Sequence, residues 1–579
     1  METTRGTKQL QLKGLSKLVA EKLEEWNVPG AAVAVVKDDE VVMAEGFGYR
    51  DVDQRLEVTP ETVFAIGSVT KSFTTAAMGV LVDEGKLDWD EPVRDYLPGF
   101  KLHDPVATER LTPRDLACHR SGLPRHEFVW YHNAAITREE LIERLRYLEP
   151  NVDFREKWQY QNLMYTTAGY MAGKLAGDSW EGFVRERLLT PLEMHESNFS
   201  VEEMQRLPNY ALPYKLKDNV LKQIPFHNID AIGPAGSINS NVLEMANWVK
   251  FQINKGTFSG KSLISEATMA TMHTPHMPCT ICLPSKELPM SNYGLGWFID
   301  PYRGYHMLHH GGNIDGFSAL VSFMPYENIG LVILTNMDAS PLPYALNFYI
   351  YDQLLGNEAI DWNGRMKEEQ KKMKEMQTGL KGAPKSDPIE GTTPSHPLED
   401  YTGKYAHPGY GELKVELVKG KLQVFFNSFA LPLTHYHYDT FVLDFEPVEA
   451  KFLTSFHTDV HGYIAHYTIP LALEPGAAEI KFAKLPDEML SDSARLATFA
   501  GQYDLEGKQL ITVSVKGEKT LHMSIPGQPE YELVPHANRS FNIKNLSGFS
   551  VRFEEDSAGK VTGIRLNQPN GEFVAERKN

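Results

Sequence analysis

The chain has 579 residues, of which 42% are hydrophobic and 23% are charged, as in folded globular proteins and unlike disordered ones. This length predicts about two to four domains. The net charge of −18 argues against nucleic acid and against an anionic membrane surface as partners, because both need a basic footprint on the protein.

The N-terminal residues lack the apolar core of a secretory signal. No later segment approaches the ~20 apolar residues that span a membrane. We therefore expect a cytoplasmic protein without a membrane partner; a leader that has been removed stays open as the alternative.

Residues 1–356 mix helix and strand patterns. Apolar residues at helical spacing predict helices over about 12–26 and 341–355. Two strand pairs joined by polar turns lie inside these helices, 31–36 with 40–44 and 319–324 with 329–335. Strands at both ends with helices between them predict an α/β (α+β) domain with a central antiparallel sheet and a helical subdomain.

The rest of the chain changes in character. Residues 357–397 read as a linker, with a charged helix over 365–376 and a stretch rich in Pro, Gly, Ser and Thr over 382–397. From residue 398 onward, short strand patterns alternate with turns, and the pattern Leu-x-x-Tyr/Phe-x-Gly-x-Tyr occurs at 398–405 and again at 496–503. We predict two small antiparallel β-barrel modules, 398–487 and 488–579, which serve for packing and carry no chemistry of their own.

The strongest motif for chemistry is Ser68-x-x-Lys71, after Gly67 and at the start of a helical pattern that runs to residue 84. Ser68 would lie at a helix N-terminus, and Lys71 would project from the same face one turn later. A buried lysine with a depressed pKa can take the proton of a serine hydroxyl. Alone, the motif is weak, since a surface Ser and Lys on an ordinary helix would look the same.

Two further motifs add candidate residues. In Tyr160-x-Asn162, the phenol could transfer protons, with its pKa lowered by cationic neighbours, and the amide could hold Lys71 and a substrate. In His310-Gly311-Gly312-Asn313, the imidazole could face the substrate as a donor, and the glycines allow close backbone approach along a strand edge. The backbone N–H groups of Asn313 and Ser68 could form an oxyanion hole.

Together, these motifs and their order resemble the serine β-lactamase and penicillin-binding protein superfamily. The segments 27–31, 111–116 with 121–123, and 293–297 are similar to the class C β-lactamase-related branch. The resemblance covers about 1–355 and implies Ser68 as nucleophile, Lys71 and Tyr160 as the acid/base pair, and no metal or other cofactor. A hydrolase domain followed by two lipocalin-like barrels resembles the D-aminopeptidase members of that branch, in which one barrel can reach the mouth of the active site.

The third motif departs from class C β-lactamases, which carry lysine where this chain has His310. Lysine is a fixed cation suited to a substrate carboxylate, whereas histidine is mostly neutral near pH 7. We therefore expect a D-amino-acid peptidase, amidase or esterase acting on small molecules or short peptides. A β-lactamase or D,D-carboxypeptidase, and a binding protein on an inactive hydrolase fold, are the alternatives. The sequence leaves open whether the chain forms a homo-oligomer.

Other candidate sites are weaker. With Cys118, the pair Cys279-x-x-Cys282 makes three cysteines, too few for a disulfide scaffold or a four-thiolate zinc site, and they fit a reducing compartment. A zinc site with the nearby His273 and His276, or a redox switch, stays open beside an incidental pair. His309 is expected to serve packing or face solvent, and the pair His435-x-His437 to be exposed.

Overall fold

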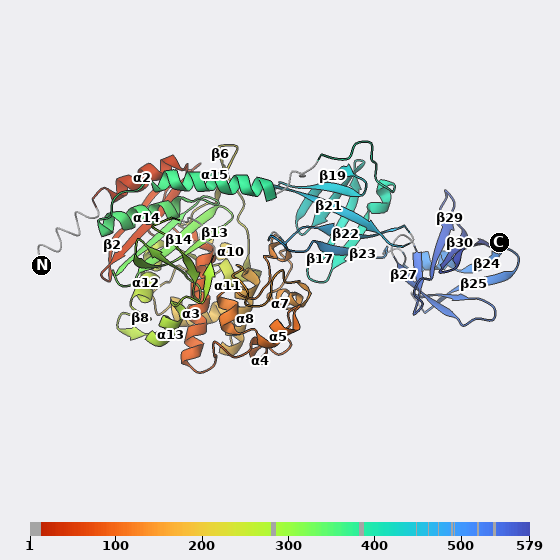
Figure 1. Ribbon diagram of the computed structural model, residues 1–579, viewed down its shortest axis with the longest axis horizontal. Helices are drawn as coiled ribbons and strands as arrows, with labels where there is room; N and C mark the ends of the chain where they lie inside the picture. The colour runs from red at the N-terminus through yellow and green to blue at the C-terminus, as the bar shows by residue number, and fades with distance from the viewer. Residues whose placement is uncertain are drawn as a thin grey trace, which may run out of the picture. The chain divides into compact units, whose positions relative to one another are not determined.

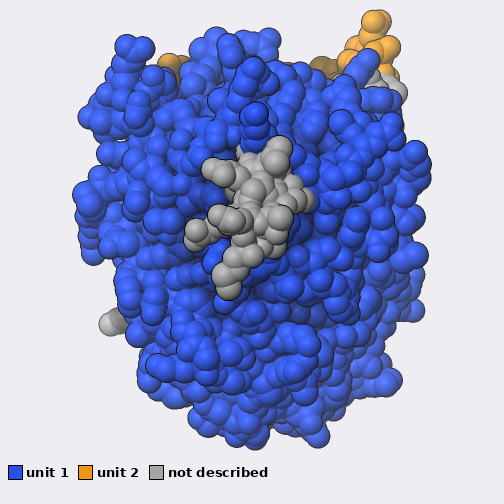
Figure 2. All heavy atoms as spheres, turned by 90° about the vertical axis from the view of Figure 1, so that its left-hand side faces the viewer, with its two compact units in different colours: residues 1–377, 472–478 blue, residues 378–471, 479–579 orange. Residues whose placement is uncertain are grey.

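The computed structural model describes residues 13–279, 285–380, 387–446, 449–460, 462–472, 474–487, 490, 492–517, 520–536 and 540–578 (Figure 1). The chain forms two compact units, one of residues 1–377 with 472–478 and one of residues 378–471 with 479–579 (Figure 2). Of the helices in the described ranges, none is long and apolar enough to cross a membrane.

The first unit is built on one nine-stranded antiparallel sheet. In spatial order its strands are β10 (Met277–Cys279), β11 (Ser291–Tyr293), β12 (Phe298–Tyr302), β13 (Tyr305–Ile314), β14 (Phe317–Met324), β15 (Ile329–Thr335), β1 (Gly30–Lys37), β2 (Glu40–Asp51) and β3 (Leu56–Glu57). β1 pairs with both β2 and β15, so the two predicted strand pairs join at the centre of the sheet. The prediction of an antiparallel sheet made by both ends of the region is confirmed.

Helices cover both faces of this sheet. On one face, α2 (Leu15–Glu25) and α14 (Leu342–Leu355) pack on alternate residues of β15, including Leu331 and Ile333. On the other face lies α12 (Val242–Ile253); a Cβ at Gly330 of β15 would be 2.1 Å from the side chain of Val249. Because every residue of β15 is buried, its continuous apolar run reflects cover on both faces.

The segment between β3 and β10 carries α12 and the helical subdomain (Figure 1). Its helices are α3 (Thr70–Asp83), α4 (Val93–Tyr96), α5 (Pro105–Arg110), α6 (Pro113–Ala117), α7 (Arg138–Arg144), α8 (Asn162–Ala176), α9 (Trp180–Val184), α10 (Val201–Met204), α11 (Gly233–Gly236), α12 and α13 (Glu266–Met272). The short strand pairs β4 (Phe64–Ala65) with β7 (Asn239–Ser240), β5 (Tyr214–Lys217) with β6 (Val220–Gln223), and β8 (Thr257–Phe258) with β9 (Lys261–Ser262) lie between them. α3 and α8 pack against each other, and this brings the two halves of the predicted site together.

The predicted charged linker helix is α15 (Trp362–Leu380). It begins with a buried contact, since Trp362 Nε1 donates to Asp352 Oδ2 of α14 at 2.9 Å. Beyond this first turn, the helix carries the alternating charges that the sequence indicated.

Two closed eight-stranded antiparallel barrels follow, as predicted. The first consists of β16 (Gly403–His407), β17 (Gly411–Val418), β18 (Lys421–Phe426), β19 (Phe429–His437), β20 (Thr440–Phe445), β21 (Ala450–Thr458), β22 (Ile464–Ile469) and β23 (Ile480–Lys484). The second consists of β24 (Gly501–Leu505), β25 (Gln509–Lys516), β26 (Thr520–Ser524), β27 (Tyr531–His536), β28 (Ser540–Ile543), β29 (Ser550–Glu555), β30 (Val561–Gln568) and β31 (Gly571–Arg577).

The sequence repeat marks the same structural device in both barrels. A short helix, η6 (Leu398–Tyr401) or α16 (Ser493–Phe499), leads into the first strand of its barrel. The buried Tyr405 hydroxyl donates to the carbonyl of Tyr401 at 2.7 Å, and the Tyr503 hydroxyl donates to that of Phe499 at 2.7 Å. Each tyrosine thereby satisfies a carbonyl at the end of the short helix and fixes its entry to the barrel.

Candidate active site

Ser68 lies in a tight connection between a strand and a long buried helix. β4 is followed by the 3-10 helix η1 (Gly67–Val69), and α3 begins directly after it. Gly67 has a φ of 52°, in the left-handed region that glycine adopts without steric penalty. The half-buried Ser68 therefore sits on the 3-10 turn that opens the predicted helix.

Lys71 is fully buried and lies within hydrogen-bonding distance of three oxygens. Its Nζ is 3.0 Å from Ser68 Oγ, 2.7 Å from Asn162 Oδ1 and 2.7 Å from the carbonyl oxygen of Ala235. The spacing from Ser68 is the helical one that the motif indicated, while Asn162 comes from the start of α8 and Ala235 from α11.

The pKa of Lys71 is held well below its ordinary value of 10.5, chiefly because burial penalises the ammonium form. Glu127 opposes this shift and Arg125 adds to it. A neutral amine keeps two N–H donors and one lone pair. The two short contacts, to Asn162 and Ala235, can use the donors, which leaves the lone pair for the Ser68 hydroxyl.

Tyr160 also lies at Ser68, with which its phenol shares a hydrogen bond. Its ring centroid is 4.7 Å from Lys71 Nζ and 5.3 Å from the guanidinium carbon of Arg125. The pKa of Tyr160 is raised, and not lowered as the sequence led us to expect, because burial outweighs the effects of the Ser68 hydrogen bond and of Arg125. The phenol is thus protonated in the resting site and available as an acid.

The third motif lies on β13 and faces the turn of Ser68. β12 pairs with β13 only as far as His309, so within the described ranges the stretch from Gly311 to Asn313 has a strand partner, β14, on one side only. A Cβ at Gly312 would be 1.8 Å from the carbonyl oxygen of Ile66 and 3.0 Å from the amide nitrogen of Ser68. A Cβ at Gly67 would be 2.9 Å from the amide nitrogen of Asn313. The two glycines therefore let the backbones that carry both predicted oxyanion donors come into contact.

His310 is buried, and the pKa of its imidazole is lowered to about 3, chiefly by burial and then by Lys71. Its Nδ1 is 2.7 Å from the carbonyl of Gly311, so Nδ1 carries the proton and donates it. The remaining nitrogen, Nε2, accepts from the Tyr293 hydroxyl at 2.9 Å. This differs from the prediction that His310 donates to a substrate, because both ring nitrogens already have protein partners.

Comparisons with known proteins identify the family to which the chain belongs. The family described as Beta-lactamase matches residues 15–354, more than half of the chain. The chain belongs to the Beta-lactamase family. It is a serine hydrolase of that family, and its resemblance to the β-lactamase and penicillin-binding protein superfamily is confirmed. Residues 387–484, which include the first barrel, match a domain of unknown function, DUF3471.

Three relatives show how far the similarity extends. Unguisins hydrolase ungD' of Aspergillus campestris is 29% identical over 427 residues, which cover 69% of this chain and 77% of that protein. Protein flp of Staphylococcus aureus is 27% identical over 338 residues, 57% of this chain and 64% of that one. The octameric penicillin-binding protein homologue from Pyrococcus abyssi aligns with a TM-score of 0.53 and 26% identity, covering 82% of this chain and all of that one.

The site of this Beta-lactamase family member contains residues that the sequence motifs did not single out. Asn162 Nδ2 donates to Glu127 Oε2 at 3.1 Å, and Arg125 Nε donates to Glu127 Oε1 at 3.0 Å. Asn162 thus bridges Lys71 and the Glu127 carboxylate through two hydrogen bonds. These contacts join segments far apart in the chain, and no local pattern marks them.

His119 is a second residue that the sequence analysis did not select. Its buried ring lies 4.4 Å from that of Tyr160 and 4.9 Å from that of Tyr293, between centroids. Its Nδ1 accepts from the backbone N–H of Gln161 at 3.0 Å, next to Tyr160. Burial, and then Lys71, lower the pKa of His119 well below 6.5, so it packs as a neutral ring that positions Tyr160.

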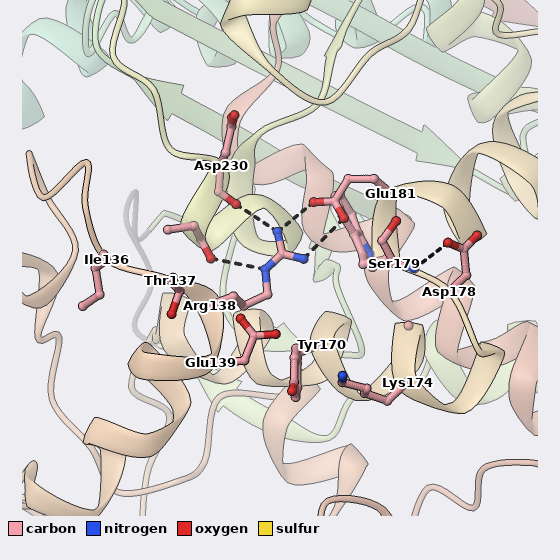
Figure 3. Close-up of a pocket in the computed structure, with 13 residues that line it drawn as sticks. Ile136, Thr137, Arg138, Glu139, Tyr170, Lys174, Asp178, Ser179, Glu181 and Asp230 are labelled. Atoms are coloured by element: carbon pink, nitrogen blue, oxygen red, sulfur yellow. Dashed lines mark hydrogen bonds and ion pairs between the residues drawn. The ribbon is translucent and has the colours of Figure 1, made fainter.

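A pocket of about 420 Å3 opens elsewhere in the subdomain, between α7, α8 and α9 (Figure 3). Its lining excludes Ser68, Lys71 and Tyr160. Arg138 points across it to Glu181 at 2.7 Å and donates to the carbonyls of Asp230 and Ala231. These bonds fix the chain just before α11 and so help to hold the Ala235 carbonyl that Lys71 uses.

The cysteines and histidines that the sequence offered as weaker candidate sites make ordinary protein contacts within the described residues. Cys282 lies outside the described residues, and Cys279 ends β10. The ring nitrogens of nearby histidines are engaged, His273 Nε2 with Gln252 Oε1 and His276 Nε2 with the carbonyl of Thr271, both at 2.9 Å. The buried His309 pairs with Asp300 at 2.8 Å. His435 and His437 are half-buried and not exposed as predicted, and the strand register shifts between them.

Proposed function

We propose that this serine hydrolase cleaves amide or ester bonds of small substrates through an acyl-enzyme on Ser68, and that peptides or amides with D-configured residues are its first candidate substrates. The observation that carries the proposal is the buried Lys71, with its depressed pKa, 3.0 Å from Ser68 Oγ. The hydrolase name of the Aspergillus campestris relative supports hydrolysis over binding alone.

In the acylation step, Ser68 Oγ attacks the substrate carbonyl carbon while Lys71 accepts the hydroxyl proton. The C–O bond to Ser68 forms and the carbonyl π pair moves to oxygen. The resulting negative charge would meet the N–H groups of Ser68 and Asn313, across the contact that Gly67 and Gly312 permit.

Collapse of this intermediate breaks the bond to the leaving group, which needs a proton. Tyr160 can donate it, because burial keeps its phenol protonated, and the proton held by Lys71 then returns to the phenol. In the second half-reaction, water hydrolyses the acyl-enzyme by the same steps. Its proton goes to Lys71 or Tyr160, its oxygen attacks the acyl carbon, and Ser68 leaves with a proton.

The third motif bears on the substrate class. With a pKa of about 3, His310 is neutral at any physiological pH and is no fixed cation for a substrate carboxylate. This favours peptidase, amidase or esterase activity over the β-lactamase or D,D-carboxypeptidase alternative. The unpaired side of β13 beside Ser68 suits an extended peptide backbone, which can add its own hydrogen bonds there.

Turnover of matched substrates tests this proposal. Full-length protein and Ser68→Ala would be assayed with the p-nitroanilides of D- and L-alanine, a p-nitrophenyl ester and nitrocefin. We expect turnover of the D-anilide or the ester to exceed that of nitrocefin, and Ser68→Ala to be inactive on each. Efficient nitrocefin turnover with no anilide or ester activity would instead establish the β-lactamase alternative.

A further inference from the structure

A cluster of His132, His227 and Asp315 lies outside the catalytic constellation. Each residue presents one potential ligand atom, and these three atoms lie within 4.8 Å of one another. His227 Nδ1 and Asp315 Oδ2 are 2.6 Å apart, and the rings of His132 and His227 stack with centroids 4.2 Å apart. The Tyr131 hydroxyl donates to the other oxygen of Asp315 at 3.1 Å.

We propose that His132, His227 and Asp315 form a binding site for one divalent transition-metal ion, with zinc as the best match. Two imidazoles and one carboxylate, with a fourth position left for water, are a common zinc ligand set. Calcium and magnesium prefer all-oxygen sites, and imidazoles favour the later transition metals.

The distances are compatible with such a site after small side-chain movements. Tetrahedral zinc with ligands at about 2.0–2.2 Å separates its ligand atoms by about 3.3 Å. The His227–Asp315 contact must therefore open slightly, and the widest separation must close by about 1.5 Å. The His132 and Asp315 side chains are partly solvent-exposed and can rotate toward the His227 side chain, of which 9% is exposed.

The cluster ties together three segments that also hold the Ser68 site. His132 follows η2 (Glu127–Val129), which contributes Glu127. His227 precedes α11, which contributes the Ala235 carbonyl, and Asp315 follows β13, which contributes Asn313. A metal here would cross-link these segments, without entering the acyl-transfer steps.

The backbone conformation of His132 also supports a metal site. His132 has a φ of 54°, a left-handed conformation that costs energy for a residue with a Cβ. The rings of Tyr131 and His132 nevertheless both pack against that of His227, with centroids 4.7 and 4.2 Å away. The strained residue thus directs its imidazole at the other two candidate ligands.

Zinc retention by the full chain tests the proposal. Protein with Cys279→Ser and Cys282→Ser, which removes the Cys-x-x-Cys pair of the sequence as a competing metal ligand, would be equilibrated with zinc, freed of unbound metal and analysed for zinc per chain. We expect one zinc ion per chain in this background and equally in Ser68→Ala and His435→Gln. We expect His227→Gln and Asp315→Asn each to weaken zinc binding by more than the roughly 10–100-fold that loss of an outer hydrogen-bond partner costs, for which Tyr131→Phe is the matched control.

A variant that gains a spectroscopic band distinguishes loss of the metal site from misfolding. In the same background, cobalt(II) should give a visible spectrum without a thiolate charge-transfer band, and His132→Cys should create that band. A folded His132→Cys protein without the band, a background that binds no zinc, or zinc retained in the His227→Gln/Asp315→Asn double variant would each overturn the proposal. Because metal content is measured, the outcome is independent of whether Ser68 is the nucleophile.

Discussion

Lys71 is the residue on whose proton affinity the proposed chemistry depends. It lies in a fully buried position among neutral hydrogen-bond acceptors, while the charge of Glu127, which accepts a hydrogen bond from Asn162, opposes the lowering of its pKa. An ammonium ion in such a place lacks the solvation it has in water. The buried amine therefore gives up its proton at a lower pH than a solvent-exposed lysine does, and this shift of the pKa also affects the stability of the fold.

The pH dependence of unfolding should reveal the depressed pKa of Lys71. On unfolding, Lys71 regains its ordinary pKa of 10.5 and binds a proton, so the free energy of unfolding should rise with pH between the depressed folded pKa and 10.5. We predict that Lys71→Met reduces this slope by about 1.4 kcal/mol per pH unit in the range between that folded pKa and 10.5.

Urea unfolding followed by tryptophan fluorescence measures that slope. All 8 tryptophans lie between residues 26 and 362, so the signal reports the first unit alone. The exposed Lys261→Met serves as the control and should keep the wild-type slope. Equal slopes in wild type and Lys71→Met would show that Lys71 is charged in the folded protein.

At the residue scale, the sequence could predict contacts that are local, such as the 3.0 Å contact between Ser68 and Lys71. Ser68 and Lys71 are three residues apart on one helix, so their contact follows from helical geometry. Glu127, Ala235 and His119 reach the site only through tertiary packing, and a lone sequence has no signal for them. The direction of the Tyr160 pKa shift was wrong because it depends on burial, which the motif does not encode.

Among the elements, the contact between β13 and η1 is the most demanding. Gly312 has its Cα so close to Ile66 that a Cβ would lie 1.8 Å from that carbonyl oxygen. Since the obstacle is backbone, no side-chain rotation can relieve it. The strand must move away from Ser68 to accept any larger residue.

Gly312→Ala should therefore impair catalysis as well as stability. We predict a fall in kcat/KM of about 10²–10³-fold, the cost of losing one oxyanion donor, and destabilisation of about 1–3 kcal/mol from overpacking. Steady-state kinetics and urea unfolding measure both. Gly364→Ala on α15 is the control, because its Cβ would meet side-chain atoms of Asp361 and no backbone. Full activity in Gly312→Ala would contradict the role given to this contact.

The elements themselves were largely predictable. Strand patterns at 31–36 and 319–335 gave the sheet, since buried strands read as apolar runs between polar turns. The repeat around Tyr405 and Tyr503 gave the two barrels. The order of the strands and the place where β12 stops pairing depend on tertiary contacts. They could therefore not be predicted from the sequence.

On the scale of the whole molecule, the site belongs to the first unit. Every group bonded around Ser68 lies within residues 1–377, and the same unit includes the short segment 472–478. This segment adds a hydrogen bond from Asn151 Nδ2 to the carbonyl of Pro475 at 3.1 Å, and the charge of Glu474 helps to raise the pKa of Arg125. One such bond contributes only about 1 kcal/mol.

A chain ending at residue 397 should consequently fold and keep its chemistry. We predict labelling of Ser68 by a small fluorophosphonate at a rate close to that of the full-length protein, with a slightly lower Tm. Circular dichroism and gel fluorescence check the two parts. A folded but unlabelled truncated protein would mean that the barrels, or the segment 472–478, are needed to complete the site.

The central claim is that Ser68 carries the acyl group. Intact-mass spectrometry after brief incubation with a p-nitrophenyl ester, followed by peptide mapping, tests it most directly. The account predicts one acyl mass per chain, located on Ser68, absent from Ser68→Ala and much slower to form in Lys71→Met. An adduct on another residue, or an equal adduct in Ser68→Ala, would contradict it.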